Sequence, residues 1–169
     1  MRVADYIFKY LKDYGIDIVF LVVGGGAMHL NDALKKSGIP YVCFHHEQAC
    51  AMAAEGYSRI SGRMACICVT SGPGGTNALT GIVGAWLDSV PILVFSGQVN
   101  QTRTKHLRQL GDQEINIIDI VRPVTKYASM VDNPDMISTE LEMALHYATT
   151  ERFGPVWLDI PLRVQSALY

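Results

Sequence analysis

The chain has 169 residues and a formal net charge of −2, and it therefore lacks the basic excess that is typical of nucleic-acid-binding domains. It is long enough to bury the core of one domain, and no apolar run approaches the ~18 residues that a membrane-spanning helix needs. Charged residues make up 18% of the chain, against about 25% in a typical domain. We therefore expect a partner to cover part of its surface.

The chain alternates helix-like and strand-like segments. Apolar residues three or four apart predict a first helix over residues 3–14, which ends at Gly15. Further helices are predicted at 27–36, 48–60, 76–87, 115–121 and 134–150. Strands are predicted at 16–23, 41–44, 64–70, 91–96, 124–127 and 156–160, and a long loop at 97–112. This alternation predicts an α/β fold, a six-stranded parallel sheet with helices on both faces.

The four cysteines lie in or beside apolar segments, which is typical of reduced, buried thiols in a cytoplasmic protein. Cys43, His45, His46 and Cys50 are close together, but their spacing matches no common zinc motif. The sequence therefore predicts no metal site. The N-terminal segment is too charged to be a secretory signal.

Three strand ends carry the residues best suited to chemistry. They are residues 23–27, 45–48 and 70–77, and they are expected at one edge of the parallel sheet, where such folds bind ligands. Two of these turns are rich in glycine, which lets a backbone approach a phosphate. Neither has the G-x-G-x-x-G or the G-x-x-x-x-G-K-[ST] spacing of a nucleotide site. Tight strand-to-helix turns would explain these glycines equally well.

Glu47 stands where a strand gives way to a helix. One interpretation is a helix-start carboxylate that complements the helix dipole, which contributes about 0.3–1 kcal/mol. The other is a desolvated carboxyl that shares a proton with a ligand nitrogen. Position alone favours the first. For the neighbouring His45 and His46, packing or a backbone hydrogen bond is a simpler role than substrate contact.

Taken together, these segments resemble the pyrimidine-binding (Pyr) domain of thiamine-diphosphate (ThDP) enzymes, in particular the large subunit of acetolactate synthase. The resembling segments are residues 45–62, 70–99, 113–127 and 153–161. The joint signal is a glutamate in H-E-Q followed by S-G-P-G-x-x-N, and it is more specific than either half.

The resemblance implies that Glu47 hydrogen-bonds N1′ of the aminopyrimidine and favours the tautomer that takes the proton from thiazolium C2. It also implies a role for Gln113, which matches a glutamine directed at the reacting end of the cofactor. It assigns the lining of the pyrimidine pocket to Gly24, Gly25, Thr70, Pro73 and Asn77. Gln98 is expected to be structural, near a domain interface.

Three segments depart from the pattern of the acetolactate synthases. Residues 23–27 read V-G-G-G-A where V-P-G-G-A is usual, and residues 111–114 read G-D-Q-E in place of A-F-Q-E. Residues 159–164 read D-I-P-L-R-V in place of D-[IL]-P-K-D-V. The aromatic and the lysine that shape the substrate channel are thus absent. The alternatives are a simple 2-oxo-acid decarboxylase subunit and a non-catalytic Pyr-like interaction module.

The chain has nothing that resembles the family's diphosphate and Mg²⁺ motif, which begins G-D-G and ends in Asn. Residues 1–161 are therefore predicted to be a ThDP pyrimidine-binding domain, inactive alone, and 162–169 to start a linker or C-terminal tail. A diphosphate-binding domain, of the same or another chain, would supply Mg²⁺ binding. A homodimer or tetramer acting on a small 2-oxo acid is expected, with FAD as a further candidate cofactor. Both a fragment of a longer chain and a natural small subunit fit this pattern.

Overall fold

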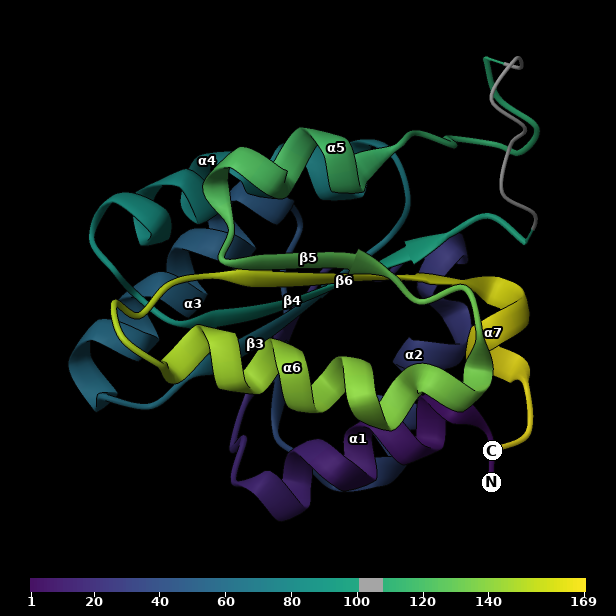
Figure 1. Cartoon of the computed structure of the whole chain (residues 1–169), viewed down its shortest axis with the longest axis horizontal. Coiled ribbons are helices and arrows are strands. Elements are labelled where there is room, and N and C mark those ends of the chain that lie inside the picture. Colours follow the sequence, from purple (N-terminus) through teal and green to yellow (C-terminus); the bar gives the residue numbers. More distant parts are fainter. Residues whose placement is uncertain (101–107) are drawn as a thin grey trace.

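The computed structural model describes residues 1–100 and 108–169. Its centre is a six-stranded sheet in the order β2-β1-β3-β4-β6-β5, and all neighbouring strands are parallel (Figure 1). The strands are β1 (Val19–Leu21), β2 (Tyr41–Cys43), β3 (Ala65–Val69), β4 (Ile92–Gln98), β5 (Tyr127–Met130) and β6 (Val156–Pro161). This confirms the predicted parallel sheet with helices on both faces.

The helices connect these strands. They are α1 (Val3–Tyr14), α2 (Met28–Ser37), α3 (Glu47–Ser61), α4 (Pro73–Leu87), α5 (Ile117–Val121), α6 (Ile137–Thr149) and α7 (Leu162–Ser166), with short 3₁₀ turns at Gly25–Ala27, Arg122–Val124 and Pro134–Met136. Helix α1 ends as predicted at Gly15, whose φ of 104° lets its N–H reach the last carbonyls of the helix.

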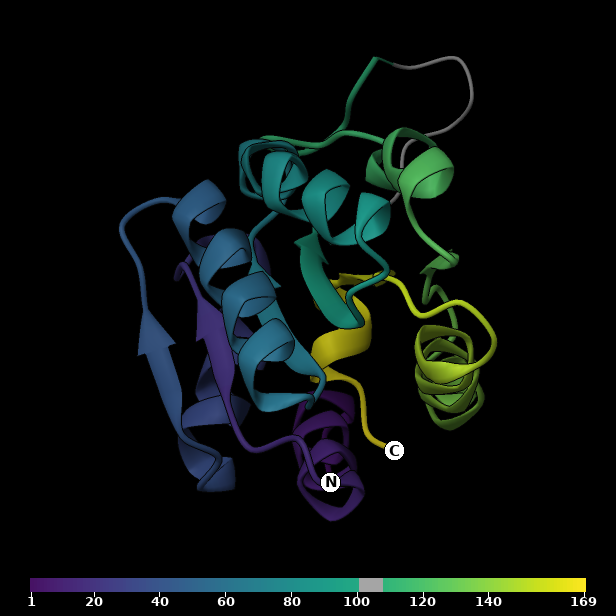
Figure 2. The ribbon, with the colours of Figure 1, turned by 90° about the vertical axis from the view of Figure 1, so that its left-hand side faces the viewer.

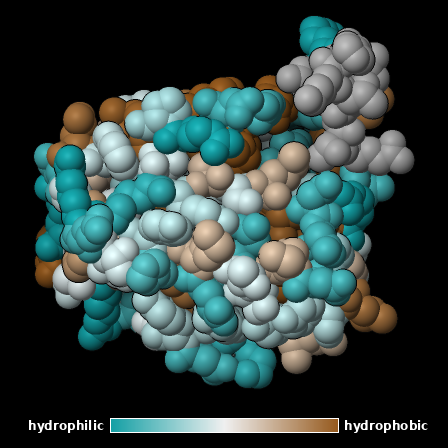
Figure 3. Space-filling view, in the orientation of Figure 1, coloured by the Kyte–Doolittle hydropathy of each residue, from teal (hydrophilic) through white to brown (hydrophobic). Residues whose placement is uncertain are grey.

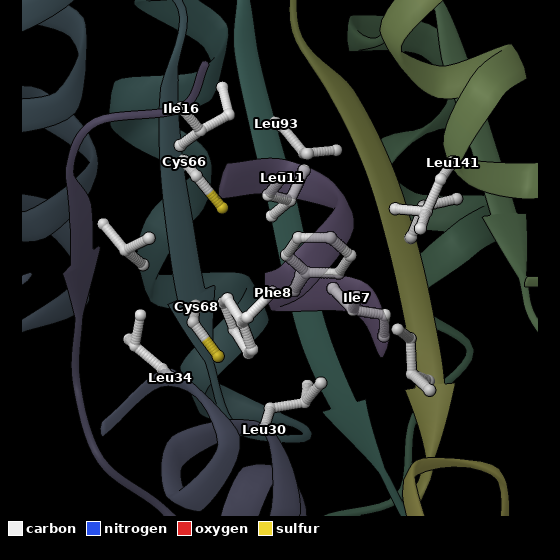
Figure 4. Packing of buried hydrophobic residues seen from close by; sticks show 14 of the residues in the cluster. Ile7, Phe8, Leu11, Ile16, Leu30, Leu34, Cys66, Cys68, Leu93 and Leu141 are labelled. Atoms are coloured by element: carbon white, nitrogen blue, oxygen red, sulfur yellow. The ribbon is translucent and has the colours of Figure 1, made fainter. Parts of the chain in front are cut away.

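The sheet separates two hydrophobic clusters. Helices α1, α2 and α6 cover one face, and α3, α4 and α5 cover the other (Figures 1 and 2). Strand β3 shows why both faces are apolar, because Cys66 and Cys68 point to the first cluster and Ala65 and Ile67 to the second. Figure 4 shows Phe8 of α1 packed among residues of the first cluster.

Several boundaries differ from the sequence prediction. Helix α4 begins three residues earlier, because Pro73 occupies its first turn, where the missing N–H of proline costs nothing. Strand β4 continues through Gln98 and so shortens the predicted loop 97–112. Residues 101–107 of that loop lie outside the described residues. Strand β5 lies at 127–130 rather than 124–127.

The last residues of the chain pack against its beginning. Val164 and Gln165 of α7 are fully buried. Leu168 forms an isolated antiparallel bridge with Arg2, and the rings of Tyr6 and Tyr169 lie 4.4 Å apart. The segment 162–169 is therefore packed onto the domain, and its last residues lie beside the start of the chain.

The expectation of buried thiols is correct for Cys50, Cys66 and Cys68 and wrong for Cys43. Cys43 lies on β2, an edge strand of the sheet whose side chains are all exposed. Among the helices of the described residues, none is long and apolar enough to cross a membrane.

Candidate active site

Three strands that are neighbours in the sheet, β2, β1 and β3, end in the three turns that the sequence analysis singled out. Because these strands are parallel, the turns lie together at the carboxyl edge of the sheet, where α3 and α4 begin (Figure 2). The expected placement of these turns is confirmed, and side-chain contacts join them into a site.

Glu47 is the first residue of α3, and Asn77 lies in the second turn of α4. The side-chain amide of Asn77 donates a hydrogen bond of 3.0 Å to Oε2 of Glu47. Within the part of the chain that the structure describes, Oε1 has no hydrogen-bond partner. Glu47 is half-buried and Asn77 is exposed. The pair thus presents a fixed carboxylate with one oxygen open to a ligand.

His46 helps to fix the start of α3. Its Nδ1 accepts the backbone N–H of Gln48 at 3.1 Å, as an N-cap does. The predicted backbone hydrogen bond is therefore confirmed for His46. The N-cap also places the carboxylate of Glu47 in the first turn, where the helix dipole favours a negative charge.

The distance between Glu47 and Asn77 depends on how closely α3 and α4 cross. A Cβ at Gly81 of α4 would lie 2.6 Å from Cβ of Ala51 on α3. Real Cβ atoms do not approach so closely, so only glycine allows this crossing. A glycine in the middle of a helix therefore has a packing role that brings the two site helices together.

The glycine turn after β1 packs against the turn after β3. A Cβ at Gly24 would lie 2.4 Å from Cβ of Thr70, and a Cβ at Gly26 would lie 2.7 Å from Oγ of Ser71. The N–H of Gly26 donates to Oγ1 of Thr70 at 3.0 Å. A Cβ at Gly25 would meet nothing within 4 Å, so this residue faces open space.

Gln113 packs against the turn after β3. Its φ of 58° is in the left-handed region, and its backbone carbonyl would lie 2.3 Å from a Cβ at Gly72, which itself has a φ of 59°. These two unusual conformations allow the loop before α5 to touch the S-G-P-G turn. Residues with strained backbone are often part of a functional site.

A cavity of about 650 Å³ opens between these turns. Of the predicted site residues, Gly24, Gly25, Thr70 and Gln113 line it, whereas Glu47, Pro73 and Asn77 do not. The predicted residues therefore fall into two groups. One group lines the cavity, and the other is the hydrogen-bonded pair of Glu47 and Asn77. Pro73 is exposed, and its position in the first turn of α4 shapes the turn between the two.

The cavity also has lining residues that the sequence analysis missed, among them Met28, Asp112 and Leu162. Ser71 was within the motif and could have been included. Met28 and Leu162 gave no signal as site residues, since apolar side chains at helix starts are more often part of the core.

A buried polar network joins β4 and β6. Oδ1 of Asp159 accepts from Ser96 at 2.5 Å, and Oδ2 accepts from Nε2 of Gln98 at 2.9 Å. The same Gln98 nitrogen donates to the carbonyl of Ile115 at 2.9 Å and so attaches the segment that follows Gln113 to the sheet. The structural role predicted for Gln98 agrees with these contacts. Burial raises the pKa of Asp159 to about 7.

Metal ligands do not cluster in the part of the chain that the structure describes, where no group of three His, Cys, Asp or Glu residues is suited to hold an ion. The carboxylate, the amide and the open glycine turn are instead suited to an uncharged or weakly basic ring that presents nitrogen atoms.

Comparison with known proteins shows the family to which the chain belongs. Residues 1–120 match the family described as thiamine pyrophosphate enzyme, N-terminal TPP binding domain. The chain belongs to this family. Its all-parallel α/β sheet is thus that of a Pyr domain.

The most similar relatives include acetolactate synthase large subunits. The chain is 40% identical over 159 residues to that of Haemophilus influenzae and 42% identical over 168 residues to that of Corynebacterium glutamicum. These alignments cover 94% and 99% of this chain but only 27% and 26% of the relatives. A probable acetolactate synthase large subunit of Methanocaldococcus jannaschii is 39% identical, with 98% of this chain and 28% of the relative covered. The chain spans about a quarter of the length of these relatives.

Proposed function

We propose that this chain is the pyrimidine-binding half of a ThDP site, in an enzyme that decarboxylates or ligates 2-oxo acids. One observation carries the proposal. The carboxylate of Glu47 is fixed at a helix start by Asn77, and one of its oxygens has no partner in the described part of the chain. An oxygen so placed is suited to the ring nitrogen N1′ of an aminopyrimidine.

The shape of the site supports the same ligand. The cavity, which Glu47 and Asn77 do not line, has a volume within the range of small-molecule sites, about 300–1,000 Å³, and so has room for the part of a ligand that extends beyond this pair. Gly25 offers open space, and a side chain there would fill part of it. Gly24, Gly25 and Thr70 would form the wall beside the pyrimidine, with Pro73 and Asn77 from the third turn. Gln113 would lie toward the reacting end of the cofactor.

Each residue has a distinct task in the proposed mechanism. Glu47 exchanges a proton with N1′, which its open oxygen allows. Asn77 holds the other oxygen, so the carboxylate cannot rotate away from the ring. Because the residues of this turn are glycines, no side chain of the turn occupies the space that the ring needs. When bound, ThDP supplies an electron sink for cleavage beside a carbonyl group.

A second domain is needed to complete the site. The bond between Glu47 and Asn77 is solvent-exposed, and water competes with a ligand for an exposed carboxylate. We propose that a diphosphate- and Mg²⁺-binding domain, of the same or another chain, covers this edge. In addition, Met52 and Leu87 of α3 and α4 are 46% and 67% exposed. Figure 3 shows apolar residues along the upper margin of this face, where α4 and α5 lie, interspersed with polar ones. These exposed groups are suited to a protein interface, and a homodimer or tetramer is part of the proposal.

The substrate is a separate question from the cofactor. Leu162 lines the cavity at the position where the acetolactate synthase pattern has lysine. This observation favours a second candidate within the same chemistry, a 2-oxo-acid decarboxylase that does not make acetolactate. A panel of 2-oxo acids, with product analysis for acetolactate and for aldehydes, distinguishes the two.

The test of the cofactor role is Glu47→Gln in the enzyme completed with its diphosphate-binding domain, ThDP and Mg²⁺. Loss of the exchangeable proton should lower the turnover rate at least about tenfold. The control is Glu55→Gln on the same helix α3, which loses only an ion pair to Arg59 and should retain the rate within about twofold. Equal turnover in Glu47→Gln and wild type would contradict the proposed role and would favour a non-catalytic module.

A further inference from the structure

The side chain of Gln165 on α7 contacts the glycine turn that follows β1. Its side chain is fully buried, and Nε2 donates to the carbonyl oxygens of Gly26 and Ile160, both at 2.7 Å. Gly26 is 139 residues away in sequence. This side chain thus ties the end of the described chain to the turn that lines the cavity.

The orientation of the amide is fixed by its surroundings. Nε2 faces two carbonyl oxygens, and a rotated amide would place Oε1 against both of them. Oε1 is buried and has no hydrogen-bond partner within the described residues. An unpaired buried acceptor is unfavourable, so the two donated bonds must offset its cost.

The backbone of Gly26 is restrained at two further points. Its N–H donates to Oγ1 of Thr70 at 3.0 Å. Its carbonyl oxygen lies against Gly97 of β4, where a Cβ would be only 2.0 Å away. Gln165, Gly97 and Thr70 therefore restrain the two peptide units that flank the Cα of Gly26. The adjoining Gly25 faces the cavity, so the restraint also fixes the cavity wall.

We propose that Gln165 is a positioning residue for the cofactor site. It holds the carbonyl of Gly26 so that the open backbone of Gly25 stays against the bound ring. The proposal rests on the proposed function for the identity of the ligand, whereas the restraint on the turn is a property of the chain alone. Gly97 acts with Gln165 by leaving room for the same carbonyl.

The test uses two variants. Gln165→Met retains the length of the side chain but lacks its amide, and Gly97→Ala places a methyl group against the carbonyl oxygen of Gly26. Leu141→Ala is the control, because Leu141 lies on α6 and packs in the first hydrophobic cluster rather than forming part of the turn (Figure 4). The complete enzyme is used, with hydrogen exchange of the amides of residues 24–27 and the Kd for ThDP as readouts.

In both test variants the exchange rates of the amides in the turn should rise at least about ten times more than those of the amides in the sheet, because a local restraint is lost. They should raise the Kd for ThDP at least about fivefold, while kcat at saturating ThDP stays within about twofold. The control should raise exchange throughout the domain and leave the Kd within about twofold. Gly97→Ala also serves as the test if Gln165→Met does not fold.

Two results would overturn the inference. One is turn exchange that rises no more than exchange in the sheet. The other is a test variant in which the amides of the turn exchange faster but the Kd for ThDP equals that of wild type. If the wild-type enzyme binds no ThDP, the proposed function fails, and the exchange experiment still decides whether Gln165 restrains the turn.

Discussion

Asp159 shows how a single buried carboxyl makes the stability of the fold depend on pH. The side chain is 1% exposed, and no cation pairs with it in residues 1–100 and 108–169. Its hydrogen bonds from Ser96 and Gln98 stabilise the charged form, but burial outweighs them and raises the pKa to about 7. The folded state therefore retains the proton up to near neutral pH, whereas an unfolded Asp releases it near pH ~3.9.

Stability should fall as pH rises between about 4 and 7, because in that range the folded state binds more protons than the unfolded state. Urea unfolding of wild type and of Asp159→Asn, which cannot titrate, isolates this contribution. The free energy of unfolding of wild type relative to the variant should fall by about 2 kcal/mol between pH 5 and pH 7.5. If the difference in the free energy of unfolding between wild type and variant does not change with pH, Asp159 is ionised at both pH values.

The site residues differ in how far the sequence could predict them. Glu47 and Asn77 are 30 positions apart and lie on different helices, so their spacing in the sequence does not predict that they form a hydrogen bond. The resemblance to a family supplied both. Gln165 was missed because a polar residue near a predicted tail gives no sign that it will be buried.

At the level of elements, the crossing of α3 and α4 controls the site, since one helix carries Glu47 and the other Asn77. Gly81→Ala should force the helices apart at Ala51 and lower the free energy of unfolding by about 1–3 kcal/mol, measured by urea unfolding. It should also raise the Kd for ThDP in the complete enzyme.

The control for that prediction is Gly56→Ala, also within α3. A Cβ at Gly56 would meet nothing within 4 Å, so the substitution should raise stability by about 0.5–1 kcal/mol through helix propensity. Destabilisation of the same size by both substitutions would contradict a specific contact at Gly81.

Element boundaries depended on local signals of unequal strength. Gly15 ends α1 where the sequence predicted, and Gly62 ends α3 one residue beyond the predicted 48–60, because each adopts the left-handed conformation that glycine favours. Strand β5 was misplaced by three residues, since it is an edge strand without a continuous apolar run. Helix α7 was not predicted, because a helix of five residues has too few positions to show a period.

For the molecule as a whole, the reactivity of the thiols measures whether solvent reaches the hydrophobic cluster on either face of the sheet. Cys66 and Cys68 lie in one hydrophobic cluster and Cys50 in the other. Burial raises the pKa of Cys50 and of Cys68 to about 12, and it raises the pKa of Cys66 as well. Cys43 is exposed on β2.

A thiol reagent at pH 8 should therefore modify one cysteine rapidly in the folded chain and all four in denaturant. Cys43→Ser should abolish the rapid reaction, and the total in denaturant should fall by one. Rapid modification of a second cysteine without denaturant would show that one face of the sheet is open to solvent.

The proposed function depends most directly on the contact between the carboxylate of Glu47 and N1′ of the aminopyrimidine. The measurement is the nitrogen NMR resonance of ThDP labelled at N1′, bound to the complete enzyme. In wild type the resonance should shift from its position in free ThDP toward that of a protonated ring nitrogen, and in Glu47→Gln this shift should be lost. The same N1′ resonance in both bound forms would contradict the proposal.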